Sequence, residues 1–210
     1  MRLVLASNNA KKLSELRSML ADLKVQLLPQ GELGVSEADE PHITFVENAL
    51  AKARHAAAVA MGPAIADDSG LCVDALAGQP GVISAHFAGE LPAQAGEDRE
   101  ARRRRQDVAN SSRLLQALAA SDDRNAYFLS TLVAVRHAAD PQPLVAVGRW
   151  PGRILSAPLG EQGFGYDPLM FIPEQGCTVA QMDASLKNQH SHRARAMAQM
   201  RGLLRDVWRL

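Results

Sequence analysis

Two adjacent carboxylates and a hydroxyl lie between two short apolar runs in the stretch from Ala64 to Asp74, which reads Ala-Ile-Ala-Asp-Asp-Ser-Gly-Leu-Cys-Val-Asp. The first run predicts a buried strand that ends at Asp67 and Asp68 and delivers them to a cleft. A carboxylate pair is costly to bury without a cation or several donors. Such hard oxygen ligands suit Mg²⁺, which takes one or two carboxylates together with water and phosphate oxygens. The alternative, which this stretch taken alone favours, is a surface turn with Gly70 as its hinge.

A second candidate site lies where the first helix begins. The apolar run 3–6 predicts a buried strand, and small polar residues that can cap a helix follow it, namely Ser7, Asn8 and Asn9. Leucines at helical spacing come next, at positions 13, 16, 20 and 23. Lys11 and Lys12 oppose the helix dipole in the first turn, and a bound phosphate would resolve that conflict. A solvated pair of lysines explains the pattern about as well.

The region from residue 29 to about residue 59 predicts an acidic loop and then a helix. Residues 29–41 are acidic and turn-rich, which is typical of a solvated loop. Thr44 and Glu47 match a capping box, and the helix they begin has a predicted buried stripe of Val46, Ala49, Leu50, Ala53 and Ala57. Asn48 and Lys52 lie one turn apart on the polar face, where they either point into one cleft or are simply solvated.

The middle of the chain predicts helical structure and a mixed sheet. A long helix or a pair of helices covers about 97–119, with Val108, Leu115 and Leu118 inward. It contains the run Arg102 to Arg105, which acidic residues flank and no aromatic residue interrupts, so we interpret it as a solvated face without function. Residues 127–136 and 144–150 predict two antiparallel strands, and Ile154 is a candidate start for a third.

Two stretches near the C-terminus are candidates for binding a base. The glycine-rich segment Gly160 to Pro168 contains Phe164 and Tyr166, which predicts either aromatic faces accessible to a base or a turn with one core aromatic. Ser191 can cap a final helix, with Met197, Met200 and Leu204 among its inward residues. Arg193 in its first turn again opposes the dipole, so an anion or a carbonyl of a ligand is expected beside it.

Composition limits the class of protein. The chain has 210 residues, of which 47% are hydrophobic and 22% charged, as in an ordinary globular domain. Lys and Arg together number 23, as do Asp and Glu together, so the formal net charge is zero. No global charge therefore favours binding to duplex nucleic acid or to an anionic membrane. Two distant cysteines, Cys72 and Cys177, suggest neither a disulfide framework nor a zinc site. No stretch approaches the ~20 apolar residues of a membrane span, and we expect a cytoplasmic protein.

Taken together, five motifs resemble the Ham1/RdgB family of inosine triphosphate pyrophosphatases. They are Leu5 to Lys12, Thr44 to Ala49 with Lys52, Ala66 to Leu71, Phe164 to Pro168, and Ser191 to Arg193 with Lys187. The resemblance runs nearly end to end and implies one domain, 1–210, with a two-lobed α/β fold. It also implies a long central mixed β-sheet flanked by helices, a nucleotide cleft between the lobes, a homodimer and Mg²⁺. The implied reaction converts aberrant purine triphosphates (ITP, dITP, XTP) to the monophosphate and pyrophosphate.

The resemblance also implies roles for individual residues. Asp68 is the general base, and Glu40 and Asp68 are the metal carboxylates. The implied phosphate contacts are Ser7, Asn9, Lys12 and Lys52, with Asn8, Ala10 and Lys11 in the same loop through their backbone, and Ser69 is a further substrate contact. The implied base pocket consists of Phe164, Gly165, Tyr166, Asp167, Lys187, His192 and Arg193. Asp67 is expected only to orient its neighbour.

The chain departs from the family pattern at His86, where an arginine is usual, and at Ser185 and Leu186, where acidic residues are frequent. Two alternative functions stay open from the sequence. One is a pyrophosphatase of the related Maf type that acts on modified pyrimidines or other nucleotides. The other is a non-catalytic module that binds nucleotide or RNA, to which the run of arginines gives slight support.

Overall fold

A computed structural model describes the backbone of residues 1–210 and every side chain except that of Lys11, so the prediction for the Lys11 side chain lies outside the described residues. Seven strands form one sheet in the order β2-β1-β3-β4-β5-β6-β7. Their bounds are β1 Arg2–Leu5, β2 Gln26–Pro29, β3 Ala64–Val73, β4 Asn125–Val135, β5 Leu144–Ile154, β6 Met170–Ile172 and β7 Cys177–Thr178. The α-helices are α1 Ala10–Met19, α2 Phe45–Ala60, α3 Arg99–Ala117, α4 Ala184–His190 and α5 His192–Trp208.

The sheet is mixed. β1 pairs in parallel with β2 and β3, whereas β6 pairs antiparallel with β5 and β7. The expected α/β fold with a mixed sheet flanked by helices is therefore confirmed. Among the described residues, no helix is long and apolar enough to cross a membrane.

The chain divides into two compact units. The first contains residues 1–69, 130–149 and 190–210, and the second contains residues 70–129 and 150–189. The single two-lobed domain and the cleft between lobes stay predictions.

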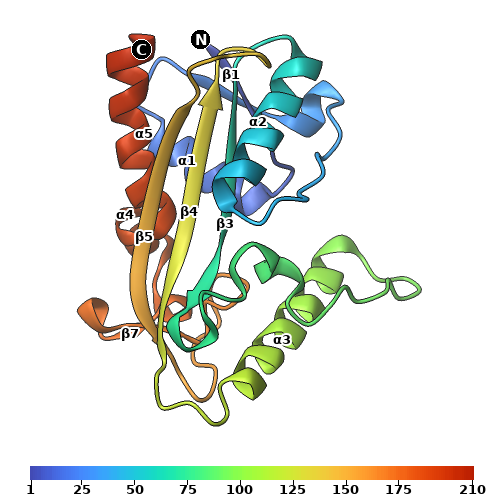
Figure 1. Cartoon of the computed structure of the whole chain (residues 1–210), viewed down its shortest axis with the longest axis vertical. Helices are drawn as coiled ribbons and strands as arrows, with labels where there is room; N and C mark the ends of the chain where they lie inside the picture. Colours follow the sequence, from blue (N-terminus) through green and yellow to red (C-terminus); the bar gives the residue numbers. More distant parts are fainter. The chain divides into compact units, whose positions relative to one another are not determined.

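In the first unit, helices cover both faces of the sheet (Figure 1). On one face, leucines of α1 and methionines of α5 pack on β1, through Leu16, Leu20, Met197, Met200, Leu3 and Leu5. On the other face, α2 packs through a stripe of alanines at 49, 53, 56 and 57. Because alanine side chains are short, α2 lies close to the strands. Lys52 on the same helix therefore reaches Asp68 of β3.

The alternation of side chains along β3 decides which helix each acidic residue faces. Ile65 packs in the core beneath α1 and α5, whereas Ala64 and Ala66 pack beneath α2. Successive side chains of a strand point to opposite faces. Asp67 therefore faces α1 and α5, and Asp68 faces α2.

The second unit has its own core under α3. Leu114 of α3 and Leu118, which caps its C-terminal end, pack with Trp150, Leu169 and other apolar residues. The helix begins at the cap Asp98, whose side chain accepts a hydrogen bond from the Ala101 N–H.

Two predicted strand boundaries are wrong. β3 continues without a break through Asp67, Asp68, Ser69 and Gly70, so it does not stop at the carboxylates, and Gly70 is not a hinge. The surface-turn alternative is wrong for the same reason. The strand continues because both carboxylates have cationic partners, Lys12 and Arg193 on one face and Lys52 on the other. Ile154 ends β5 and does not begin another strand.

Two predicted inward residues point outward. Val46 is 40% exposed and Val108 is 67% exposed. At the level of Val108, the buried positions of α3 are polar instead, Gln106 and Asn110. Their side chains bond the backbone at Gly89 and Ala85, a pattern that apolar periodicity does not reveal.

We expect Gly148→Ala to destabilise the protein by about 1–3 kcal/mol through overpacking. A Cβ at Gly148 would lie 1.9 Å from the His192 carbonyl oxygen and 2.4 Å from the Ala196 nitrogen, so β5 and the start of α5 would have to separate. The control is Gly202→Ala within α5, where a Cβ meets nothing within 4 Å and helix propensity favours alanine. Thermal and urea unfolding measure both, and equal stability of the two variants would contradict the prediction.

Candidate active site

The start of α1 supplies the first group of candidate residues. Asn9 is the cap, since its Oδ1 accepts from the Lys12 N–H at 3.3 Å. Ser7 Oγ accepts from the Asn9 N–H at 3.1 Å and fixes the turn before it. Asn8 instead donates to Glu37 at 3.2 Å, and Ala10 opens the helix in an exposed position.

Helix α2 supplies the second group. Thr44 caps it and accepts from the Glu47 N–H, as predicted. Asn48 is 1% exposed and Lys52 is 9% exposed, so the alternative of a solvated face is wrong for both. The Asn48 amide accepts from the His42 N–H at 3.0 Å and donates to its carbonyl at 3.1 Å. It thereby holds the loop that carries Glu40 against the helix.

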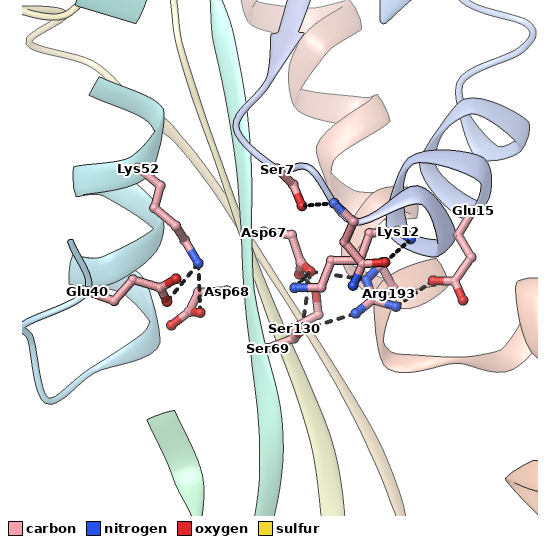
Figure 2. Close-up of polar contacts among 11 residues, drawn as sticks. Ser7, Lys12, Glu15, Glu40, Lys52, Asp67, Asp68, Ser69, Ser130 and Arg193 are labelled. Carbon is pink, nitrogen blue, oxygen red and sulfur yellow. Dashed lines mark hydrogen bonds and ion pairs between the residues drawn. The ribbon is translucent and has the colours of Figure 1, made fainter. Parts of the chain in front are cut away.

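Lys52 joins the two carboxylates that the family resemblance identifies as metal ligands. Its ammonium donates to Glu40 Oε2 at 3.0 Å and to Asp68 Oδ1 at 2.9 Å (Figure 2). The other oxygen of Asp68, Oδ2, is buried and has no hydrogen-bond partner among the described residues. Two carboxylates against one ammonium leave an excess of negative charge, which a cation would compensate.

Burial and mutual contact shift the pKa values of Asp68, Glu40 and Lys52. Burial raises the pKa of Asp68, and the Lys52 ammonium offsets this only in part, which leaves a pKa of about 6. Burial also acts to raise the pKa of Glu40, but Lys52 outweighs it and lowers that pKa. Burial would lower the pKa of Lys52, yet the two carboxylates raise it. Lys52 is thus charged at neutral pH, and Asp68 can exchange a proton near neutral pH.

Asp67 is the centre of a second network on the opposite face of β3 (Figure 2). Its side chain is fully buried, and its Oδ2 lies 2.8 Å from Lys12 Nζ and 3.2 Å from Arg193 Nε. The hydroxyl of Ser69 donates to the same oxygen at 3.2 Å, and that of Ser130 donates to Oδ1 at 2.6 Å. Asp67 therefore holds groups from three other elements, α1, β4 and α5.

Arg193 extends this network to Glu15 of α1. Its other nitrogens donate to the Glu15 carboxylate and, at 3.0 Å, to Ser69 Oγ. Ser191 caps α5 and accepts from the Ala194 N–H at 3.1 Å, as predicted. The prediction of a ligand anion beside Arg193 is not needed, because two carboxylates of the protein, Asp67 and Glu15, already pair with it.

The charges of this second network are balanced, which fixes its ionisation. Burial would raise the pKa of Asp67, but Lys12 and Arg193 outweigh it and hold that pKa well below its usual range. Burial lowers the pKa of Lys12, and Asp67 opposes that shift. Burial would also lower the pKa of Arg193, whereas Asp67 and Glu15 raise it. Asp67 is thus ionised at every pH at which the protein is expected to work.

The glycine-rich loop belongs to the second unit and is fixed by carboxylates. Asp167 Oδ2 accepts from the Phe164 N–H at 2.9 Å and from Lys187 Nζ at 2.7 Å. A Cβ on Gly163 would lie 2.0 Å from that oxygen, so only glycine fits there. The Gly165 N–H donates to Asp107 of α3 at 2.8 Å.

The two aromatic residues of the loop differ. Tyr166 is 5% exposed, and its hydroxyl donates to the Ser84 carbonyl at 2.9 Å, so its predicted accessibility to a base is wrong and it is the core aromatic. Phe164 is half-buried, with Lys187 Nζ 4.7 Å from its ring centroid. Of the two rings, Phe164 is the one with a surface left for a ligand.

The predicted site residues thus form two groups. The first group lies in the first unit and gathers around β3 (Figure 2). It consists of Ser7, Lys12, Glu40, Lys52, Asp68, Ser69 and Arg193. Asn9 caps α1 beside Lys12, and His192 is buried at the start of α5. Within the second unit, Phe164, Gly165, Tyr166, Asp167 and Lys187 gather around the loop. The His86 side chain is 56% exposed and lies 3.9 Å from Glu90.

Comparisons with known proteins identify the family. The model of the Ham1 family matches residues 3–203. The chain belongs to the Ham1 family. It is 63% identical over 211 residues to a dITP/XTP pyrophosphatase of Leptothrix cholodnii, covering 100% of both chains, and 64% identical over 209 residues to one of Methylibium petroleiphilum, covering 99% of both. A solved HAM1 protein of Coxiella burnetii is 40% identical, with a TM-score of 0.86 over 97% of this chain and 98% of that one.

Sequence analysis missed four residues that organise this Ham1-family site. They are Glu15, Asn48 as the support of the Glu40 loop, Ser130, and Asp67 as the centre of a network. The doublet of acidic residues was a usable signal for Asp67, because alternation along a strand turns two neighbours to opposite faces. For Glu15 and Ser130, the printed sequence holds no local signal.

We expect Asp67→Asn to cost about 3–5 kcal/mol in stability at pH 7, because it leaves the buried Arg193 and the half-buried Lys12 without their counter-charge. A carboxyl with a lowered folded pKa stabilises above its unfolded pKa of ~3.9, and the stabilisation is lost as pH falls toward the folded value. The stability gap between wild type and Asp67→Asn should therefore shrink below about pH 4.

Urea unfolding between pH 3 and pH 8 measures that gap. Asp206→Asn, at an exposed position of α5, is the matched control and should change stability by less than about 0.5 kcal/mol. A gap that is small at pH 7, or that widens in acid, would show that Asp67 does not hold the network.

Proposed function

We propose that the chain hydrolyses aberrant purine nucleoside triphosphates such as ITP, dITP and XTP to the monophosphate and pyrophosphate. The observation that carries this proposal is Asp68, a buried carboxylate with a pKa of about 6 and one oxygen, Oδ2, without a partner among the described residues. A group of this kind can accept a proton from water near neutral pH. Family membership, together with relatives named dITP/XTP pyrophosphatase, supports the choice of substrate.

Glu40 and Asp68 fit a divalent metal ion, and we propose Mg²⁺. Asp68 offers a buried, unpartnered oxygen, and the two carboxylates together exceed the charge of Lys52. No cluster of three or more His, Cys, Asp or Glu side chains suited to a metal occurs among the described residues. Mg²⁺ tolerates so few protein ligands because water and substrate phosphates complete its shell. When bound, it supplies positive charge against the phosphates and acidifies water.

The side chains of the protein have separate tasks in this proposal. Asp68 takes the proton of the attacking water, and cleavage falls between the α and β phosphates. Lys52 stabilises the charge that develops on the leaving pyrophosphate. Lys12, whose side chain is 18% exposed, offers a second ammonium, together with the backbone N–H groups at the start of α1. Ser7, Asn9 and Ser69 line this phosphate side.

The second unit supplies candidates for purine recognition. Phe164 offers a ring to stack on, and Lys187 offers a donor held in place by Asp167. A fixed donor toward the 6-oxo oxygen of the purine would reject adenine, which presents a donor at that position. His192 and Arg193 stay proposed base contacts on the family resemblance alone, as do the homodimer and the cytoplasmic location.

The test measures pyrophosphate release from ITP, dITP, XTP, GTP, dTTP and UTP in excess Mg²⁺ and in EDTA. We expect release from the first three that EDTA abolishes. We expect Asp68→Asn to lower kcat/KM by about 10²–10⁴-fold, because it removes the base, while Asp206→Asn leaves it unchanged.

Each contrary outcome has a distinct meaning. Preference for dTTP or UTP would favour the Maf-type alternative, and absence of release would favour a nucleotide-binding module. Near-normal hydrolysis by Asp68→Asn would remove Asp68 from the proposal.

A further inference from the structure

The run Arg102 to Arg105 on α3 is not uniform in the structure. Arg102 and Arg104 are exposed, and Arg105 forms an ion pair with Glu97 at 2.8 Å. Arg103 is half-buried, and its guanidinium carbon lies 4.7 Å from the centroid of the Phe164 ring. The interpretation of the run as a solvated face is therefore wrong at Arg103, and Arg105, which is also half-buried, is held by its ion pair with Glu97.

Helix α3 holds the glycine-rich loop at two points one turn apart. Arg103 contacts the Phe164 ring, and Asp107, four residues later on the same helical face, accepts from the Gly165 N–H at 2.8 Å. The position of Arg103 over the loop is thus set by a helix that is itself bonded to the loop backbone.

Two cations share the Phe164 ring, and they differ in mobility. Lys187 Nζ also lies 4.7 Å from the centroid, but its 2.7 Å ion pair with the buried Asp167 fixes it. Arg103 reaches the ring from a half-exposed position on a long side chain. Of the two cations, Arg103 is the one that can move when a ligand approaches the ring.

We propose that Arg103 is a substrate-binding residue that stacks on the purine, an inference that rests on the proposed function. The base enters against Phe164, and the guanidinium moves outward by the thickness of one ring, about 3.5 Å, to lie on the outer face of the base. A planar guanidinium stacks well on aromatic rings, whereas a lysine ammonium does not. The base is then held between the Phe164 ring and Arg103.

The test compares Arg103→Ala with Arg104→Ala, which removes the same charge from an exposed neighbour on the same helix. We expect Arg103→Ala to raise KM for ITP and XTP by about 3- to 30-fold with little change in kcat, and Arg104→Ala to change neither. Arg103→Lys keeps the positive charge but lacks the planar guanidinium, so its KM should lie between those of wild type and Arg103→Ala.

Inorganic tripolyphosphate separates a contact to the base from damage to the whole site, because it has no base. We expect its inhibition constant to be the same for wild type and Arg103→Ala, and both to melt at similar temperatures. The proposal would be overturned if Arg103→Ala weakened the binding of ITP and of tripolyphosphate equally. It would also be overturned if the KM of Arg103→Ala equalled that of Arg104→Ala or fell below that of wild type.

The two proposals fail in different ways. If the wild-type protein releases no pyrophosphate from any purine triphosphate, the proposed function fails. If the wild type is active and Arg103→Ala behaves like Arg104→Ala, only the role of Arg103 fails.

Discussion

The buried carboxylate of Asp67 is the charge on which the organisation of the first unit depends. It accepts contacts from Lys12 of α1, Ser130 of β4 and Arg193 of α5, and Arg193 in turn joins Glu15 of α1. Buried charges of this kind are tolerated only when paired and hydrogen-bonded. The network therefore determines where α1 and α5 begin relative to the central strand, and those two helix starts carry candidate phosphate and base contacts.

Asp67 also determines what its neighbour can do. The strand turns Asp67 and Asp68 to opposite faces, so Lys12 and Arg193 pair with Asp67. Among the described side chains, the cation that pairs with Asp68 is Lys52, which Asp68 shares with Glu40. Burial then dominates the ionisation of Asp68 and raises its pKa to about 6. One adjacent pair of the same residue type thus supplies a fixed structural charge and a group that can exchange a proton, with the difference set by environment alone.

Much of the fold follows from local pattern. The first strand, the caps at Thr44 and Ser191 and the stripes of α2 and α5 were predictable, because burial imposes a period of two or 3.6 on apolar residues. The interruption of β3 was wrongly predicted, because an acidic doublet is polar by composition and becomes buried only through partners elsewhere in the chain, 63 and 126 residues away for Asp67 and 16 residues away for Asp68. The prediction that Val108 points inward was wrong for a related reason. In this part of α3 the buried side chains are Gln106 and Asn110, which bond backbone carbonyl groups.

The sequence indicated which residues form the candidate site better than it indicated which of them contact one another. The family motifs brought forward Glu40, Lys52 and Asp68, which the structure joins through one ammonium. They gave no sign that Tyr166 is committed to the core, or that Arg103 alone of four arginines lies on Phe164. Those distinctions depend on which face of a loop or helix meets another element, and local spacing does not encode that.

The measurement that tests this account most directly is a residue-resolved NMR titration of the carboxyl carbons in the metal-free protein. It follows Asp67 and Asp68 separately, with Asp67→Asn and Asp68→Asn used to assign the signals. The account predicts that Asp67 stays ionised from pH 8 down to pH 4, while Asp68 titrates with a pKa of about 6. Titration of both carboxyls at the ordinary value for aspartate, or of Asp67 in place of Asp68, would contradict it.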